Sequence, residues 1–258
     1  TWLTKIWKRK GSQSRLKDNR FVHGKEPFAK LLEKCVVEMI ALSLDKATPQ
    51  MQAGSRKGRS TRDQLLKVII LQKYHESQGR PLPVLLVDVQ SCFDKMRLDD
   101  VIYDSIEAGC DIKATRVLRK CSDKTIIKLK GDPRNNGAGV GMEVRGTLGQ
   151  GSNFAPPGIG LTSCKSVAEE FEGEEHLMAS VGVVTADQQS YVDDIAAMPK
   201  NEKSTREVSE KIGVALETIS LRSHPDKTEV VVSGGNKKAQ AMREALTARP
   251  AMMQGHEV

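Results

Sequence analysis

The sequence contains few aromatic residues and no long apolar run. Phe, Trp and Tyr make up 4% of its 258 residues, so the hydrophobic 38% that can form a core is mainly aliphatic. No stretch of about eighteen apolar residues occurs, which excludes a membrane-spanning helix. The chain begins at Thr1 with neither an initiator Met nor an apolar signal core, and we expect an excised or processed fragment.

Cysteine is also scarce, and its pattern excludes two classes of small protein. The five cysteines are widely spaced, and no two of them have Cys-x-x-Cys spacing. This pattern argues against a disulfide framework and against a zinc site. It predicts an intracellular, reducing compartment, without distinguishing the nucleus from the cytoplasm. The five histidines show no paired spacing either, and we assign no ligand or catalytic role to either residue type.

Positive charge is in excess, and the excess lies in one block at the N-terminus. Residues 1–34 contain ten Lys and Arg against three Asp and Glu, which equals the net charge of +7 of the whole chain. Such a block is typical of a surface that contacts a polyanion. A solvated basic tail would have the same composition.

The spacing of apolar residues predicts a mixture of helices and short strands. Amphipathic periodicity predicts helices over 26–44, 61–78, 98–108, 112–121, 161–171, 208–219 and 236–248. The helix over 208–219 is expected to begin at a capping box of Ser204 and Glu207. Strands are predicted at 2–7, 21–22, 84–89, 125–130, 228–232 and from Val144, with a Gly-rich loop over 131–141.

Two acidic segments call for a cation. Val84 to Val89 is an apolar run of strand length that carries one carboxylate, Asp88, and burying it is costly unless a positive group meets it. Asp193 and Asp194 are adjacent between β-prone runs, and their side chains converge only if the chain turns there, as in a tight hairpin. Two crowded carboxylates need a compensating cation, and Mg²⁺ selects carboxylate oxygens. An ordinary Asp-Asp turn is the alternative interpretation.

The order of these segments resembles the fingers and palm of a reverse transcriptase, more closely that of a non-LTR retrotransposon. Tyr191-Val192-Asp193-Asp194 is similar to the signature hairpin of that family, and the segment Asp88 to Asp94 is similar to its first metal-binding box. Gly149 to Ser152 resembles the Gln-Gly loop, and Lys227, 34 residues beyond Asp193, lies where the family has a lysine.

Two further segments extend the resemblance to roughly residues 5–235. Residues 53–61 resemble the Gly-Phe-Arg-Lys-Gly-Arg-Ser-Thr segment of non-LTR elements, with Ser55 in place of Phe. Residues 8–11 together with Asn19-Arg20 resemble the fingers motif, although Phe21-Val22 replaces the common Arg-Pro-Ile. None of these departures affects a carboxylate.

The resemblance implies an α+β fold, with a right-hand polymerase palm made of an antiparallel sheet backed by helices. We expect a fingers-like region over 1–83 and a palm over 84–235, with a fingers insertion within 110–145. Residues 236–258 would then form the start of a thumb or a C-terminal tail, so that the thumb would be largely absent.

The resemblance also implies roles for individual residues. Asp88, Asp193 and Asp194 are expected to hold two Mg²⁺ ions, or Mn²⁺ in their place, with the Val89 carbonyl as a further ligand. Lys227 is expected to protonate the leaving pyrophosphate, against the alternative of a simple surface lysine. The expected nucleotide-binding residues are Arg20, Lys10 or Lys8, Phe93, Gln150, Gly151 and Tyr191, and the expected template-binding residues are Arg56, Lys57 and Arg59.

Three of these roles have a structural alternative. Phe93 would exclude a 2′-hydroxyl by its size or would simply pack beside the strand. Asp94 would organise local hydrogen bonds rather than bind metal. The basic segment at Arg56, Lys57 and Arg59 would contact template phosphates or form a solvated loop.

The function implied is that of an RNA-directed DNA polymerase, the core of a retroelement reverse transcriptase. It would transfer nucleotides from dNTPs to the 3′-hydroxyl of a DNA or RNA primer on an RNA template, with no membrane partner. One alternative is an RNA-dependent RNA polymerase, against which Tyr191-Val192 and Phe93 argue. Another is a catalytically impaired or domesticated relative that only binds RNA.

Overall fold

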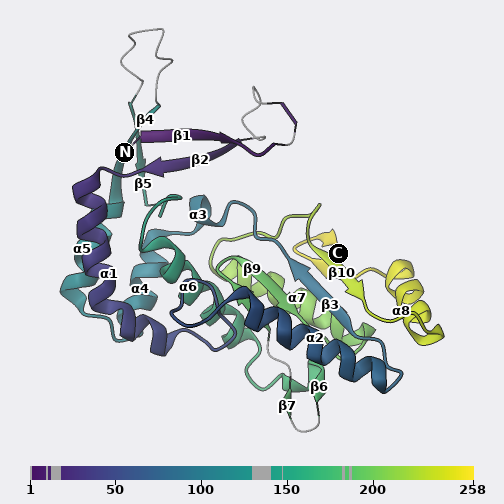
Figure 1. Ribbon diagram of the computed structural model, residues 1–258. Helices are drawn as coiled ribbons and strands as arrows, with labels where there is room; N and C mark the ends of the chain where they lie inside the picture. Colours follow the sequence, from purple (N-terminus) through teal and green to yellow (C-terminus); the bar gives the residue numbers. More distant parts are fainter. Residues whose placement is uncertain are drawn as a thin grey trace. The chain divides into compact units, whose positions relative to one another are not determined.

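The computed structural model describes residues 2–9, 11–12, 19–129, 141–146, 148–181, 184–185 and 188–258 (Figure 1). The chain forms two compact units. The first consists of Thr1–Ala47 and Phe93–Gly158, and the second of Thr48–Cys92 and Ile159–Val258. The chain therefore passes from the first unit to the second, returns to the first and ends in the second, and the bounds of fingers, palm and thumb stay predictions.

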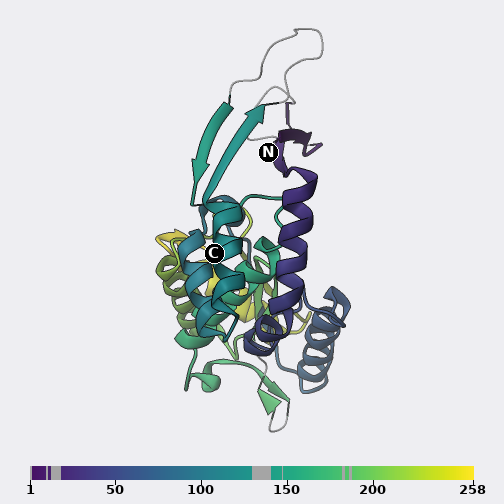
Figure 2. The ribbon, with the colours of Figure 1, turned by 90° about the vertical axis from the view of Figure 1, so that its left-hand side faces the viewer.

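The first unit combines a four-stranded sheet with a group of helices. The sheet has the order β2-β1-β4-β5, in which β1 (Trp2–Trp7) pairs antiparallel with β2 (Asn19–Gly24) and parallel with β4 (Lys124–Leu129), and β5 (Gly141–Arg145) pairs antiparallel with β4. The helices are α1 (Pro27–Ala47), α3 (Cys92–Lys95), α4 (Leu98–Glu107) and α5 (Ile112–Asp123). The helix α1 runs alongside α5 (Figure 2), and their shared core includes Ile40, Leu44 and Leu118.

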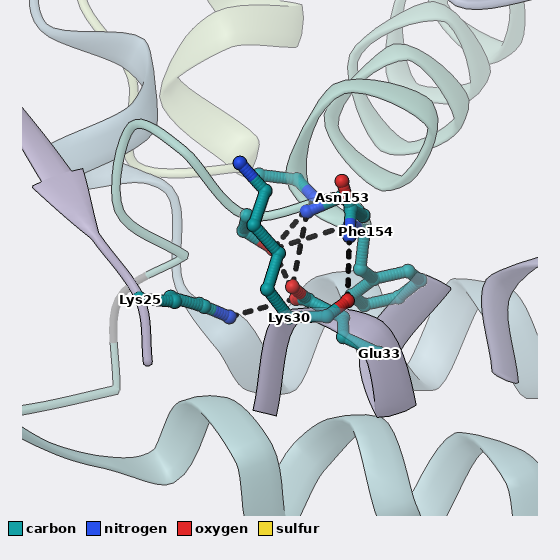
Figure 3. A network of polar contacts seen from close by, with 7 residues as sticks. Lys25, Lys30, Glu33, Asn153 and Phe154 are labelled. Atoms are coloured by element: carbon teal, nitrogen blue, oxygen red, sulfur yellow. Dashed lines mark hydrogen bonds and ion pairs between the residues drawn. The ribbon is translucent and has the colours of Figure 1, made fainter. Parts of the chain in front are cut away.

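A buried carboxylate on α1 holds the loop that precedes α6 (Ala155–Glu170) (Figure 3). Glu33 is fully buried and forms an ion pair of 2.7 Å with Lys25 Nζ. It also accepts hydrogen bonds from Ser152 Oγ and, at 3.1 Å, from Asn153 N. Ser152 Oγ in turn accepts from Ala155 N at 3.1 Å and so caps the start of α6.

The second unit is built on an antiparallel sheet of order β10-β3-β9-β8. Its strands are β3 (Pro83–Val87), β8 (Gln189–Tyr191), β9 (Asp194–Ala197) and β10 (Glu229–Val232). The unit also contains α2 (Thr61–Ser77), α7 (Glu202–Thr218), α8 (Lys237–Ala248) and the short helix η2 (Glu175–Leu177). Two small hairpins complete it, β6 (Ser180–Val181) with β7 (Val184–Thr185) and β11 (Met252–Met253) with β12 (His256–Glu257).

The two faces of this sheet have different surroundings. Because side chains alternate along a strand, Leu85 and Val87 share one face with Ile195, and all three are buried on the side where α7 contacts β3. On the opposite face Val84 packs with Val68 and Leu71 of α2. The helix α2 thus covers part of the second face.

The α+β fold with an antiparallel sheet backed by helices is confirmed, and so are most of the predicted elements. The capping box of Ser204 and Glu207 is wrong, because α7 begins one turn earlier at Asn201, whose side chain accepts a hydrogen bond from Ser204 N at 2.9 Å. Most of the predicted Gly-rich loop over 131–141 lies outside the described residues. Among the described helices, none is long and apolar enough to cross a membrane.

Candidate active site

The predicted hairpin around the Asp pair is present. Tyr191 at the end of β8 pairs with Asp194 at the start of β9, so Val192 and Asp193 alone form the loop. Val192 has a φ of 61°. A two-residue loop with positive φ at its first position resembles the type II′ turn, which matches the twist of the two strands. Asp193 therefore stands at the tip of a tight hairpin and Asp194 at its base.

The register of the sheet brings Asp88 to the same place. In the pairing of β3 with β9, Leu86 is opposite Ala196 and Val87 is opposite Ile195. The ladder ends at Val87, and continuing its register by one residue would bring Asp88 opposite Asp194; both residues line one cleft. Alternation puts both side chains on the face that carries Leu86. Two carboxylates 106 positions apart in the chain thus meet at one end of the sheet.

A cleft opens at this end of the sheet, and we call it the acidic cleft. The residues that line it include the carboxylates Asp88 and Asp194, the lysine Lys227, and residues of α2, β3 and β8, namely Leu65, Leu86 and Tyr191. The side chain of Tyr191 is 41% exposed, so it borders the cleft rather than the core. The predicted residues Asp88, Tyr191, Asp194 and Lys227 are therefore brought together.

The carboxylates of the hairpin are in an electrostatically unfavourable position. Burial raises the pKa of Asp193 above its ordinary value, the charges of Asp194 and Asp88 raise it further, and Lys227 opposes the shift. Burial also raises the pKa of Asp194, with Asp88 adding to the rise and Lys227 again opposing it. Because each shift depends on the same neighbours, all three aspartates lie within electrostatic reach of one another.

Lys227 meets Asp88 directly. Its Nζ donates to both carboxylate oxygens, at 2.9 Å to Oδ2 and 3.2 Å to Oδ1. The backbone guides it there, because His224 N donates to the Asp88 carbonyl at 2.7 Å and Lys227 N donates to the His224 carbonyl at 3.2 Å. The cation that Asp88 was expected to require is thus supplied, in this structure, by a lysine 139 positions away.

The site suits a divalent cation in its charge and in its donor atoms. Three carboxylates lie within electrostatic reach of one ammonium group, and carboxylate oxygens are the ligands that Mg²⁺ prefers. Over the part of the chain that the structure describes, however, no three His, Cys, Asp or Glu residues are arranged to hold a metal ion as they stand. Lys227 donates to both oxygens of Asp88, so a cation at this carboxylate competes with the ammonium group.

The Val89 carbonyl remains compatible with its predicted role as a ligand. Residues 88–90 pair antiparallel with residues 222–224 around a bridge between Val89 and Ser223. The two hydrogen bonds of this pairing use the Asp88 carbonyl and the N–H of Gln90, and neither uses the Val89 carbonyl.

The remaining nucleotide-binding candidates belong to the first unit. Phe93 lies in α3 and is partly buried, and Gln150 and Gly151 directly precede the Ser152 cap of α6. Arg20 lies in β2, and Lys10 is outside the described residues. The contacts of these residues with a nucleotide stay predictions.

The template-binding candidates hold their own loop together. Arg56 Nη1 donates to the carbonyls of Thr48 and Pro49 at 3.1 and 2.9 Å. Arg59 donates to the backbone and side-chain oxygens of Gln50. Lys57, in contrast, is exposed. Template contacts by these residues stay predictions, and the two arginines have a structural role in addition.

One residue at the site has no counterpart in the sequence analysis. Gln52 is buried, with 1% of its surface exposed, and its side-chain oxygen accepts a hydrogen bond from Val192 N at 2.8 Å. The only sequence signal was its place just before the basic segment 53–61. A hydrogen bond across 140 positions could not be read from local spacing.

The arrangement defines a class of protein. An antiparallel sheet backed by helices, with aspartates at a hairpin tip and at the end of the adjacent strand, is the palm of a right-hand polymerase. The sequence matches the family "Reverse transcriptase (RNA-dependent DNA polymerase)" over residues 8–256, and the chain belongs to this family. No match was found among curated proteins.

Solved structures of similar fold include telomerases of two yeasts. Apo telomerase from Candida tropicalis, truncated from its C-terminal domain, superposes with a TM-score of 0.61 at 12% identity over 85% of this chain and 48% of its own. Telomerase from Candida albicans in complex with a TWJ fragment of telomeric RNA gives 0.61 at 14% identity, over 92% of this chain and 42% of its own. The corresponding Candida tropicalis complex gives 0.62 at 11% identity, over 91% and 41%. The chain therefore spans less than half the length of these proteins.

Proposed function

We propose that the chain is the catalytic core of an RNA-directed DNA polymerase from a retroelement, of the non-LTR type that its motifs resemble. The observation that carries this proposal is the meeting of Asp88 with the Asp193-Asp194 hairpin at the open end of one sheet. Membership of the reverse transcriptase family supports the same chemistry. The proposed partners are an RNA template, a DNA or RNA primer and dNTPs, in an intracellular, reducing compartment.

The reaction joins a nucleotide to a primer. The 3′-hydroxyl of the primer gives up its proton to water, and its oxygen forms a bond to the α-phosphorus of the dNTP, while the bond from that phosphorus to the oxygen leading to the β-phosphate breaks and pyrophosphate leaves. Two divalent ions, when bound, supply positive charge at the attacking and the leaving oxygen. Asp88, Asp193 and Asp194 provide the carboxylate oxygens for them, with the Val89 carbonyl as an additional donor.

Lys227 has two successive tasks in this proposal. In the structure its ammonium group neutralises Asp88 and keeps that carboxylate in the acidic cleft. When Asp88 turns to its role as a ligand, the ammonium group is free to give a proton to the departing pyrophosphate. The side chain of Lys227 is 57% exposed, which leaves it room to move between the two positions.

The other proposed roles concern substrate binding. Phe93 lies against the deoxyribose and excludes a 2′-hydroxyl, Arg20 and Lys10 contact the triphosphate, and Gln150, Gly151 and Tyr191 contact the nucleotide. Lys57, with Arg56 and Arg59, contacts template phosphates, so that polymerase activity falls as salt rises. Two of the similar telomerase structures contain a fragment of telomeric RNA, which supports an RNA partner.

Primer extension on an RNA template tests the proposal. Asp193→Asn should lower the rate by about 100-fold or more, because losing a metal ligand removes several kcal/mol of transition-state stabilisation. Asp226→Asn, which removes an exposed carboxylate from the turn before Lys227, serves as the matched control and should keep the wild-type rate. Both variants should retain the far-UV circular dichroism of the wild type.

Three outcomes would contradict the proposal in different ways. An unchanged rate in Asp193→Asn would exclude the metal site. A preference for ribonucleotides over deoxynucleotides would indicate an RNA-dependent RNA polymerase. RNA binding without extension, in Mg²⁺ and in Mn²⁺, would indicate a relative that only binds RNA.

A further inference from the structure

The hairpin that carries Asp193 has a strained residue at its tip. Val192 has a φ of 61°, a conformation that suits glycine and that β-branched residues rarely adopt. In a two-residue loop with positive φ at the first position, glycine is the preferred residue there. Such a conformation persists only when the surrounding structure imposes it. Some other part of the chain must therefore hold Val192.

The side-chain amide of Gln52 binds both polar groups of Val192. Its Oε1 accepts from Val192 N at 2.8 Å, and its Nε2 donates to Val192 O at 3.3 Å. Because the two groups belong to the peptide units on either side of one residue, binding both fixes the orientation of each unit. One of them leads directly into Asp193. We call this pair of hydrogen bonds the Gln52 clamp.

The clamp is itself held rigidly in place. Gln52 Nε2 also lies 3.2 Å from Ser190 Oγ and 3.3 Å from Cys164 Sγ, and Gln52 Oε1 accepts from Gly54 N at 2.7 Å. The backbone on either side pairs with Ser190, since Ala53 N donates to the Ser190 carbonyl at 2.9 Å and Ser190 N donates to the Met51 carbonyl at 2.8 Å. The segment around Gln52 thus extends the sheet beside β8.

The space next to the clamp admits no additional side chain. A Cβ at Gly54 would lie 2.5 Å from Val192 N and 2.6 Å from Val192 Cγ2, far inside contact distance. A Cβ at Gly160 on α6 would lie 3.0 Å from Gln52 Nε2. Arg56 closes the loop from the other side through the carbonyls of Thr48 and Pro49. The loop before α2 is therefore built to present one amide to the hairpin.

We propose that Gln52 is a positioning residue of the active site, which holds the Val192 turn so that Asp193 is presented to the divalent cation. This inference rests on the proposed function. It predicts that the amide of Gln52 contributes to the chemical step and to cation binding more than to folding. A purely structural role would affect folding alone.

The test compares Gln52→Met with a matched control, Asn236→Leu. Asn236 also uses a side-chain amide to bind a backbone N–H and a backbone carbonyl of the second unit, accepting from Ala239 N at 2.9 Å and donating to the Gly79 carbonyl at 3.4 Å. Gln52→Met should lower kcat for primer extension by about 100-fold, as expected for a displaced catalytic group, with the KM for dNTP nearly unchanged. Asn236→Leu, assayed where it is equally folded, should keep its kcat within about threefold.

A double-mutant cycle with Val192→Gly identifies the cause. Glycine adopts a positive φ without strain, so the turn depends less on the clamp in that background. The fall in kcat caused by Gln52→Met should therefore be smaller in Val192→Gly by about threefold or more. Should Gln52→Met fail to fold, Gln52→Glu replaces it, because the carboxylate keeps the acceptor for Val192 N and loses the Nε2 donor, which contacts Val192 O, Ser190 Oγ and Cys164 Sγ.

Cation binding and amide exchange give readouts that do not need catalysis. Mn²⁺ binding, followed by the electron paramagnetic resonance of free Mn²⁺, should weaken by about threefold or more in Gln52→Met and not in Asn236→Leu. Hydrogen exchange at the amide of Val192 should accelerate in Gln52→Met alone.

The outcomes separate this inference from the proposed function. Equal losses of kcat in the two variants, or additive effects in the cycle, would overturn the positioning role of Gln52 while leaving the polymerase intact. If the wild-type chain does not extend primers, the proposed function is wrong, and the positioning role of Gln52 is then tested by Mn²⁺ binding and by hydrogen exchange at the Val192 amide alone. If the Mn²⁺ affinity and the exchange rate are both unchanged in Gln52→Met, the positioning role is wrong.

Discussion

Replacing the buried carboxylate of Glu33 should destabilise the protein strongly. Its side chain has no exposed surface and binds Lys25, whose side chain is 9% exposed (Figure 3). In Glu33→Gln the side chain keeps its size but loses its charge, so the ammonium group of Lys25 is left in the interior without its partner. Ser152 and Asn153 donate to different oxygens of Glu33. An amide offers only one acceptor oxygen, so one of these two hydrogen bonds is lost as well.

The burial of both partners sets the expected magnitude. Removing one partner of a buried ion pair costs about 3 to 5 kcal/mol. Because a little of Lys25 reaches solvent, we expect the lower end, about 3 kcal/mol. For a protein of this size that corresponds to a fall of about 6 to 12 °C in the thermal midpoint. Adding Lys25→Met removes the unpaired charge and should restore about half of the loss.

Thermal and urea unfolding, followed by circular dichroism, measure the effect. The matched control is Glu38→Gln on the same helix, because Glu38 pairs with Lys34 at 3.9 Å with both side chains well exposed. Such a surface pair contributes about 1 kcal/mol or less. A loss below about 1 kcal/mol in Glu33→Gln, or no recovery on adding Lys25→Met, would refute the reasoning.

Two further predictions concern the side chains of Lys227 and Asp193. Lys227→Met should lower the Kd for Mn²⁺ by about two- to fivefold in a paramagnetic resonance titration, because it frees both oxygens of Asp88 from a competing cation; an unchanged or higher Kd would contradict this. Asp193→Asn should raise the thermal midpoint in EDTA at pH 7.5. Burial, Asp194 and Asp88 hold the pKa of Asp193 above the value of 3.8 expected for the unfolded chain, so its charge destabilises the fold above the raised pKa. The gain should shrink as the pH falls through the raised pKa and vanish below the unfolded value, whereas a lower midpoint at pH 7.5 would show that the charge is not destabilising.

Local pattern predicted the elements well, because their causes are local. The apolar run in β3 and the periodicity of α1 depend on neighbours a few positions away. The same holds for the hairpin that carries Asp193, although its loop is Val192-Asp193 and Asp194 already belongs to β9. Its prediction as a tight hairpin is confirmed by the pairing of Tyr191 with Asp194.

Pattern was less informative about which side of a helix is buried. The apolar residues of α2 form a side with Leu65, Leu66 and Ile69, and all three are more than 40% exposed. Leu71 and His75 are buried instead. Amphipathic spacing indicates a helix, but the packing partner decides which of its residues lose contact with water.

Two local features were also not predictable from local pattern, namely the C-terminal hairpin and the first residue of α7. The C-terminal hairpin of β11 and β12 is too short to have a periodicity, and it is held by contacts such as that of Ser209 Oγ with the Met252 carbonyl at 2.8 Å. Two residues near the start of α7, Asn201 and Ser204, are of a type that can cap a helix. Asn201 serves as the cap, and Ser204 lies inside the helix and is buried.

The sequence by itself determined that Asp88 ends a buried strand and that Asp193 and Asp194 lie at a turn, since these facts follow from local spacing and residue type. Only the tertiary structure decided that β3 lies between β9 and β10, and hence that Asp88 faces Asp194 and binds Lys227. It also decided that Gln52 holds Val192. The physical reason is that these contacts join segments more than a hundred residues apart, and their pairing minimises the free energy of the whole sheet and its helices rather than that of any single segment.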